Sequence, residues 1–114
     1  MVEENMKIEL SDFLKVEMRV GQIIEANAPE WSNKLLEFKV DFGTELGQRT
    51  ICSAIRKWYQ PEFFMDKKFI FVTNLAERKM GPSVSQGMML MVDLGDKVQL
   101  VFAPDNAPLG APLG

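Results

Sequence analysis

The side chains that usually carry out catalysis are sparse in this sequence of 114 residues. It contains no histidine, so the usual general base near neutral pH and the commonest zinc ligand are both missing. Its one cysteine, Cys52, lies in an apolar stretch, where a thiol is most often buried and unreactive. No glycine-rich phosphate loop precedes a helical pattern, and no carboxylate pair stands out among the acidic residues. We therefore expect a protein that binds rather than catalyses, with no cofactor and no metal.

The basic residues are unevenly distributed along the chain. The formal net charge is −3, yet the segment 49–79 carries seven basic residues against three acidic ones, a net +4. The basic ones are Arg49, Arg56, Lys57, Lys67, Lys68, Arg78 and Lys79. A positive segment in an acidic protein permits a basic face that binds an anionic partner. Ordinary scattering of solvated charges explains the same distribution, so charge alone leaves both interpretations open.

Alternating polar and apolar residues predict short strands in the first half of the chain. Ser11 is a candidate helix N-cap and predicts a short first helix. Residues 18–24 predict a strand that bends or bulges at Gly21. Residues 36–42 alternate without interruption, so this second strand is expected to bury one face. A turn at 43–47 leads to a third strand over 49–55.

The second half begins with a break in this alternation. Over 56–65, Pro61 can open a helical turn, and Trp58 and Tyr59 are expected in the core. A fourth strand is predicted over 68–73, followed by a polar loop over 74–87. The apolar run 88–92 predicts a fifth strand covered on both faces, and 98–102 predicts a further one. Three prolines exclude a helix or a central strand from the tail.

This order of elements fits an all-β protein with a five-stranded OB-fold Greek-key barrel. A short N-terminal helix, a short helix between strands 3 and 4, and a C-terminal extension complete it, and residues 1–114 are expected to form one domain. An SH3-like barrel remains the alternative, because the pattern does not decide which strands pair. OB barrels bind oligonucleotides on the strand 2–3 face and through the loops joining strands 1–2 and 4–5. These loops, 26–34 and 74–87, hold Asn33, Lys34, Arg78, Lys79, Ser83, Ser85 and Gln86.

Seven short motifs occur in a fixed order along the chain. They are DF at 12–13, VEMRVG at 16–21, NKLL at 33–36, VDFG at 40–43, SAIR at 53–56, NLAERKM at 74–80 and SQGM at 85–88. Each is weak alone. In register they resemble the tRNA-binding domain at the C-terminus of many methionyl-tRNA synthetases, which also occurs as free-standing tRNA-binding proteins and in the endothelial monocyte-activating polypeptide family. The resemblance spans residues 11–110.

The resemblance implies an OB barrel, usually a homodimer, that binds tRNA by its overall shape. We expect a stand-alone tRNA-binding protein that could serve as an accessory subunit of an aminoacyl-tRNA synthetase. The tRNA-facing positions carried over are Lys34, Ser53, Arg56, Arg78, Lys79, Ser85 and Met88. The four basic residues are expected to contact phosphates, which fix position without reading sequence. Ser53, Ser85 and Asn74 are expected to hydrogen-bond sugar or phosphate oxygens, and Met88 to pack beneath the site.

A second function stays open within the same family. The turn 41–47 resembles the export-related chaperone CsaA, a branch thought to bind unfolded polypeptide, whereas the RKM and SQGM motifs resemble the synthetase-type branch. Trp31 has three possible roles at this stage. It could stack on a base or ribose, cap the end of the barrel, or face a second subunit.

The remaining expectations concern location and assembly. No apolar run approaches the ~18–20 residues of a membrane span, and the acidic first residues lack the layout of a secretory signal. A single cysteine cannot form an internal disulfide. We expect a cytoplasmic protein with no membrane partner. Because a small barrel leaves strand edges open, a homodimer is expected, with the first helix and the tail suited to cover an edge.

Overall fold

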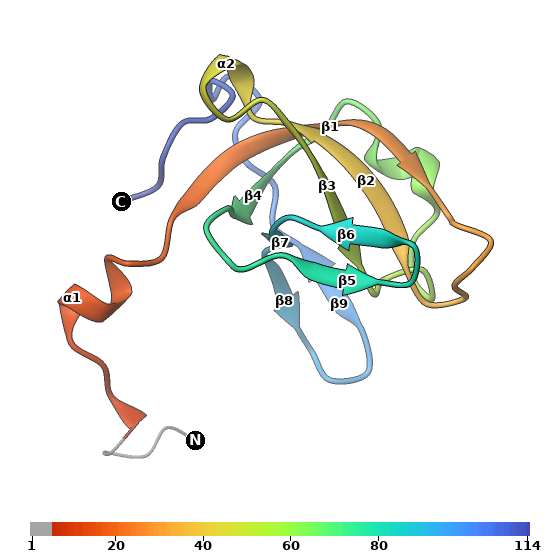
Figure 1. The fold of residues 1–114 in the computed structure, drawn as a ribbon, viewed down its shortest axis with the longest axis horizontal. Coiled ribbons are helices and arrows are strands. Elements are labelled where there is room, and N and C mark those ends of the chain that lie inside the picture. The colour runs from red at the N-terminus through yellow and green to blue at the C-terminus, as the bar shows by residue number, and fades with distance from the viewer. Residues whose placement is uncertain (1–5) are drawn as a thin grey trace.

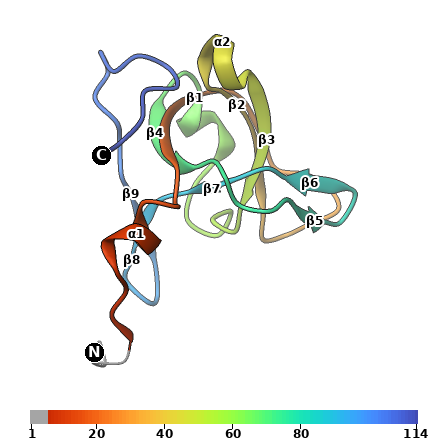
Figure 2. The ribbon, with the colours of Figure 1, turned by 60° about the vertical axis from the view of Figure 1, so that its left-hand side comes forward.

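Five antiparallel strands curl into a nearly closed barrel in the computed structural model, which describes residues 6–114 (Figures 1 and 2). In spatial order they are β3 (Gln48–Ser53), β2 (Leu36–Asp41), β1 (Met18–Asn27), β4 (Lys68–Val72) and β7 (Met88–Met89). The first half of β1 pairs with β4 and the second half with β2, so this long strand belongs to both sides of the barrel. This order confirms the OB-type Greek key predicted from the sequence.

The bulge of β1 lies a few residues beyond Gly21, where the sequence predicted it. The register with β2 shifts between Ile23 and Glu25, so the bulge is there and not at Gly21. Gly21 has a different role, because a Cβ atom on it would lie 2.6 Å from Cγ1 of Val40 and 2.7 Å from Cε1 of Phe42. The missing side chain therefore lets β1 approach the side chains of β2 closely.

The core follows from the alternation of β2. Leu36, Phe38 and Val40 are fully buried inside the barrel. One end is closed by the 3₁₀ turn η2 (Pro61–Phe64), whose Phe64 ring lies 4.8 Å from that of Phe38, centroid to centroid. Pro61 opens this turn, as predicted. Trp58 is 37% exposed, so its placement in the core was wrong. A single 3₁₀ turn starting at Pro61 directs Phe64 inward and leaves Trp58 in the preceding turn.

The segment expected to be a polar loop contains a β-hairpin. Strands β5 (Arg78–Met80) and β6 (Ser83–Ser85) pair with each other, joined by a two-residue turn at 81–82. Gly81 has φ +58°, the positive value that the first turn position of a tight hairpin requires. Strands of three residues are too short to show a period in sequence.

The apolar run 88–92 also divides differently from the prediction. It splits at Leu90 into β7 and β8 (Met91–Asp93), and β8 forms a projecting hairpin with β9 (Val98–Leu100). Met88 is 47% exposed while Met89 is buried, so the strand is not covered on both faces. Only two residues of this run, Met88 and Met89, belong to the barrel sheet, and the prediction of a five-residue strand covered on both faces was wrong.

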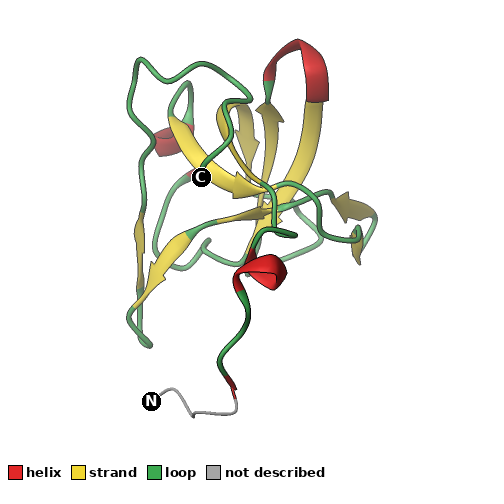
Figure 3. Ribbon diagram, turned by 90° about the vertical axis from the view of Figure 1, so that its left-hand side faces the viewer, coloured by secondary structure: helices red, strands yellow, loops and turns green. Residues whose placement is uncertain are grey.

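The two ends of the described chain behave differently. Helix α1 (Leu10–Phe13) has Glu9 as N-cap, in a reciprocal capping box with Asp12, in place of the predicted Ser11. It projects from the barrel and buries none of its residues (Figure 3). The tail instead runs along β1, where the Gly110 amide donates to the Val20 carbonyl at 2.8 Å and the Val20 amide to the Ala111 carbonyl at 3.0 Å. The tail thus covers a strand edge of its own chain, as expected.

The other connections are short. The predicted turn at 43–47 is one helical turn, α2 (Gly43–Leu46). Within residues 6–114, every helix is too short and too polar to cross a membrane.

Candidate nucleic-acid interface

The β5–β6 hairpin is attached to the barrel through its own short polar side chains. The Ser85 hydroxyl accepts a hydrogen bond from the Cys52 amide at 3.0 Å. The Gln86 side-chain oxygen accepts from the Thr50 amide at 2.9 Å, and the Gln86 amide donates to the Thr50 carbonyl at 2.8 Å. These bonds join the end of the hairpin to β3 and help to close the barrel. Two polar side chains that the sequence offered for a ligand, Ser85 and Gln86, therefore accept hydrogen bonds that fix the hairpin on the strand 2–3 face.

Cys52 lies beneath this attachment. Its thiol is buried and contacts the Ser83 hydroxyl at 3.8 Å, and that hydroxyl donates to the Glu37 carboxylate at 2.5 Å. Burial raises the pKa of the Cys52 thiol above its ordinary value, and the nearby Glu37 charge acts in the same direction. The thiol is thus kept protonated and enclosed, as the apolar sequence around it predicted.

Two hollows open beside the hairpin, and Arg78 and Met88 line both of them. The larger, a groove of about 620 Å³, is also lined by Ser53, Trp58 and a row of methionines. The smaller hollow, of about 280 Å³, is also lined by Leu75 and Ser85. Met88 was expected to pack beneath the site, but it lies exposed in the wall of the groove, because its neighbour Met89 takes the inward-facing position of β7.

The two basic residues of β5 are both exposed but differ in direction. Arg78 lies opposite Ser85 and Lys79 opposite Val84. Because successive side chains of a strand point to opposite faces, Arg78 borders the groove while Lys79 projects from the other face of the hairpin. The hairpin thus presents positive charge on both sides.

Lys34 lies in the loop between β1 and β2, which Arg56 holds in place. The Nη1 atom of Arg56 donates to the Pro29 carbonyl at 3.0 Å and also to the Ser32 carbonyl. The Arg56 amide donates to the Lys34 carbonyl at 3.2 Å. Arg56 is half-buried and engaged in the loop, whereas the Lys34 side chain is exposed.

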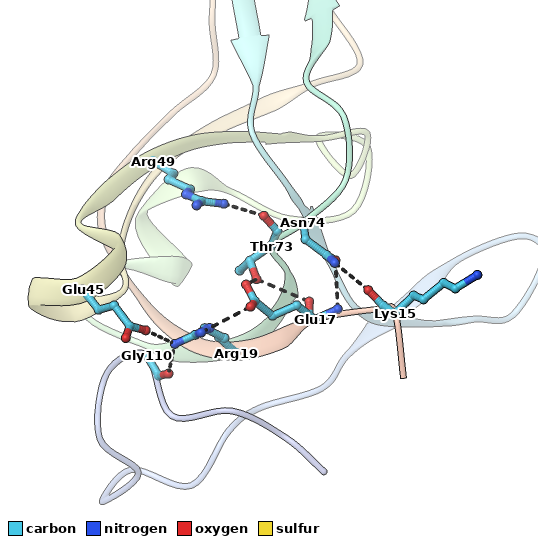
Figure 4. Close-up of polar contacts among 8 residues, drawn as sticks. All are labelled: Lys15, Glu17, Arg19, Glu45, Arg49, Thr73, Asn74 and Gly110. Carbon is cyan, nitrogen blue, oxygen red and sulfur yellow. Dashed lines mark hydrogen bonds and ion pairs between the residues drawn. The ribbon is translucent and has the colours of Figure 1, made fainter. Parts of the chain in front are cut away.

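Asn74 faces the N-terminal segment (Figure 4). Its side-chain oxygen accepts from the Glu17 amide at 2.8 Å, and its side-chain nitrogen donates to the Lys15 carbonyl at 2.6 Å. Both ends of the amide are thus engaged with the backbone that enters β1. Contact between Asn74 and RNA stays a prediction, and it would compete with these two bonds.

A polar network around Glu17, which sequence reasoning missed, extends from Asn74 (Figure 4). The Glu17 carboxylate accepts from the Thr73 hydroxyl at 2.6 Å and from Arg19 at 3.2 Å, and these bonds lower the pKa of Glu17. Arg19 also pairs with Glu45 at 2.6 Å and donates to the Gly110 carbonyl. The only sequence signal was the VEMRVG motif, since the partners lie far apart along the chain.

The structure therefore groups half of the eight predicted positions around the two hollows. Those four are Ser53, Arg78, Ser85 and Met88. Lys34 and Lys79 are exposed on the two neighbouring loops, while Arg56 and Asn74 hold chain segments together. Ser53 and Ser85 are buried, so both belong to the walls of the site. The arrangement offers exposed cations beside an apolar groove, which suits a polyanionic ligand with exposed flat or apolar groups.

These features place the protein in a known class. Residues 18–112 match the model of the family described as "Putative tRNA binding domain", and the chain belongs to this family. Methionine--tRNA ligase of Psychrobacter arcticus is 45% identical over 104 residues, which cover 90% of this chain. The chain spans about 15% of the length of the curated relatives that it matches first.

Two solved structures share the fold over nearly their whole length. The MetRS related protein from Pyrococcus horikoshii has a TM-score of 0.89 at 36% identity, covering 95% of this chain and 98% of that one. The CsaA chaperone protein from Picrophilus torridus has a TM-score of 0.86 at 28% identity, covering 95% and 100%. The family resemblance is thus confirmed, and the fold matches both of its branches.

Proposed function

We propose that this chain binds the folded body of tRNA through phosphate and sugar contacts, without catalysing a reaction itself. The observation that carries this proposal is the exposure of Lys34 on the β1–β2 loop and of Arg78 and Lys79 on the adjacent β5–β6 hairpin of a tRNA-binding domain. Phosphate contacts supply affinity that does not depend on base sequence.

The contacts divide by chemistry. Lys34, Arg78 and Lys79 contact phosphates, and the walls of the groove approach riboses, whose 2′-hydroxyl distinguishes RNA from DNA. Ser53 is the remaining hydroxyl of the groove wall for such a contact, since the Ser85 hydroxyl already accepts from Cys52 and donates to the Gly87 carbonyl. Such a surface recognises the shape of a folded RNA.

Binding of tRNA and of unfolded polypeptide, measured in parallel by filter retention or gel shift at modest salt, tests the proposal. We expect saturable retention of several different tRNAs, with affinity that falls steeply as salt rises. Tight binding of a reduced, unfolded polypeptide with no retention of tRNA would overturn this assignment.

That second outcome corresponds to a chaperone function, which one observation favours. The groove beside Arg78 is lined by Met80, Met88, Met89 and Met91, and methionine side chains adapt to varied apolar partners. The likeness to the CsaA chaperone protein supports the same function. The exposed cations beside the groove favour tRNA as the first choice.

A homodimer is the proposed assembly. Six large apolar side chains of the N-terminal segment are exposed, namely Met6, Ile8, Leu10, Phe13, Leu14 and Val16. Contiguous exposed apolar surface marks sites of protein association. Two copies would also bring two sets of exposed cations to one large ligand and raise the affinity by effective concentration. Sedimentation at micromolar concentration should give about twice the mass of 12.9 kDa, and a species of single mass would exclude the dimer.

The proposed partner is an aminoacyl-tRNA synthetase, in the same cytoplasmic compartment as tRNA. The support is the name Methionine--tRNA ligase carried by relatives that contain this domain. Added to a methionyl-tRNA synthetase catalytic unit, the domain should lower the KM for tRNA while leaving kcat unchanged, because it contributes binding and no chemistry. No change in KM would remove the synthetase from this proposal.

A further inference from the structure

The two loops that carry the exposed cations touch through Trp31. A Cβ atom on Gly81 would lie 2.6 Å from Cε3 and 2.8 Å from Cζ3 of Trp31, so the hairpin turn is in direct contact with the indole ring. Gly81 is the tip of the β5–β6 hairpin and Trp31 belongs to the loop between β1 and β2, which lie at the same end of the barrel (Figures 1 and 2). Any side chain at position 81 would push the ring away.

The loop on the Trp31 side is firmly held. Arg56 donates to carbonyl oxygens on both sides of the tryptophan, those of Pro29 and Ser32. The Ser32 hydroxyl in turn accepts from the Lys34 amide at 3.1 Å. The indole therefore projects from a braced loop, and that loop also carries Lys34.

Hydrogen bonds attach the hairpin to the barrel through one of its two strands, β6. Ser85 and Gln86 bond this strand to β3, and the Ser83 hydroxyl donates to the Glu37 carboxylate of β2. Within residues 6–114, β5 pairs with β6 and with no other strand. A two-stranded hairpin is at best marginally stable by itself and needs packing against the rest of the protein. Without the contact between Trp31 and Gly81, the outer strand β5, which carries Arg78 and Lys79, would depend on its pairing with β6 for its position.

We propose that Trp31 is a positioning residue for tRNA binding: it clasps Gly81 and so holds the cations of β5 and the cation of the neighbouring loop in one fixed constellation. This rests on the proposed tRNA binding and deepens it. The clasp lowers the conformational freedom that the hairpin would otherwise lose on binding, and pre-organisation of this kind raises affinity. The test must distinguish this positioning role from direct stacking of Trp31 on a base.

The test uses the dependence of tRNA affinity on salt for Trp31→Ala, Gly81→Ala and the double variant. Trp31→Ala removes no charge, yet it should lower the log–log salt slope by about 1.4–1.8, because two phosphate contacts lose their alignment. If the parent and the variant bind equally at 1 M salt, affinity at 50 mM salt should fall by about 70-fold to 200-fold. Gly81→Ala should act in the same direction. The fold loss of affinity in the double variant should be smaller than the product of the losses in the two single variants, because both substitutions break the same contact.

Gly47→Ala is the matched control. Gly47 lies between α2 and β3 with φ +71° and has no neighbouring atom within 4 Å of a Cβ at that position, so alanine there strains the backbone without breaking a contact. It should bind tRNA like the parent. Circular dichroism of each variant checks that the barrel remains folded.

The outcomes separate cleanly. A parent protein that does not retain tRNA overturns the proposed function, and the positioning role with it. If the parent binds and Trp31→Ala weakens binding with an unchanged salt slope, Trp31 contacts the RNA directly and positioning is wrong. Parent-like binding by Gly81→Ala would also refute the clasp.

Discussion

Replacing Arg78 by alanine should weaken the binding of every tRNA without unfolding the protein. Arg78 is exposed on β5, and among residues 6–114 nothing forms an ion pair or a hydrogen bond with its side chain. Surface substitutions of this kind change the free energy of unfolding by about 0.5 kcal/mol or less. The effect should therefore fall on binding alone.

The magnitude follows from the loss of one phosphate contact. The log–log salt slope should fall by about 0.7–0.9. If the parent and the variant bind equally at 1 M salt, this slope gives a loss of about tenfold at 50 mM and about threefold to fourfold at 200 mM. Lys34→Ala, on the adjacent loop, should give a similar loss. Because phosphates carry no sequence information, tRNAs of different sequence should suffer equally.

Filter binding at several salt concentrations, with two tRNAs of different sequence, measures these quantities. Lys39→Ala is the control of equal charge, because its ammonium is exposed on β2 and lies 3.7 Å from the Glu25 carboxylate, in an acidic part of the surface. Parent-like binding by Arg78→Ala and Lys34→Ala would mean that the site is elsewhere. A drop of many degrees in melting temperature would make these residues structural, and a loss confined to one tRNA would mean that the loops read bases.

Three further predictions concern stability and reactivity. Gly21→Ala should destabilise the barrel by about 1–3 kcal/mol, measured by urea unfolding, because the added methyl group would lie 2.6 Å from Val40; parent-like unfolding would contradict this close approach. The pKa of Glu17 is held below its ordinary value of 4.5 in the folded state, so its contribution is present at neutral pH and is lost as the pH falls below about 4.5. The stability gap between the parent and Glu17→Gln should accordingly be open at pH 7 and narrow progressively as the pH falls below 4.5, and a gap independent of pH would exclude the ion pair and hydrogen bond as its cause. Cys52 should react with a thiol reagent only after denaturation, because burial raises its pKa, and rapid labelling of the folded protein would refute this.

The sequence by itself determined the barrel and the family. The alternation of Leu36, Phe38 and Val40 is local information, since a strand with one buried face must show a period of two. Pro61 opened the turn that closes the barrel for an equally local reason, its fixed φ. The ordered motifs identified the tRNA-binding domain family from short segments, each of which is uninformative alone.

Only the tertiary structure decided which polar residues are exposed and which hold the protein together. Arg56, Asn74 and Ser85 have the side chains of a binding site, but their hydrogen bonds go to segments distant in sequence. The β5–β6 hairpin was invisible because its strands are too short to carry a period and are stabilised by packing on β3. The contact between Trp31 and Gly81 joins residues fifty positions apart, and its basis is the absence of a Cβ atom. A glycine leaves no periodic signal in the sequence, so the role of Gly81 can be recognised only from the position of the Trp31 ring in the folded protein.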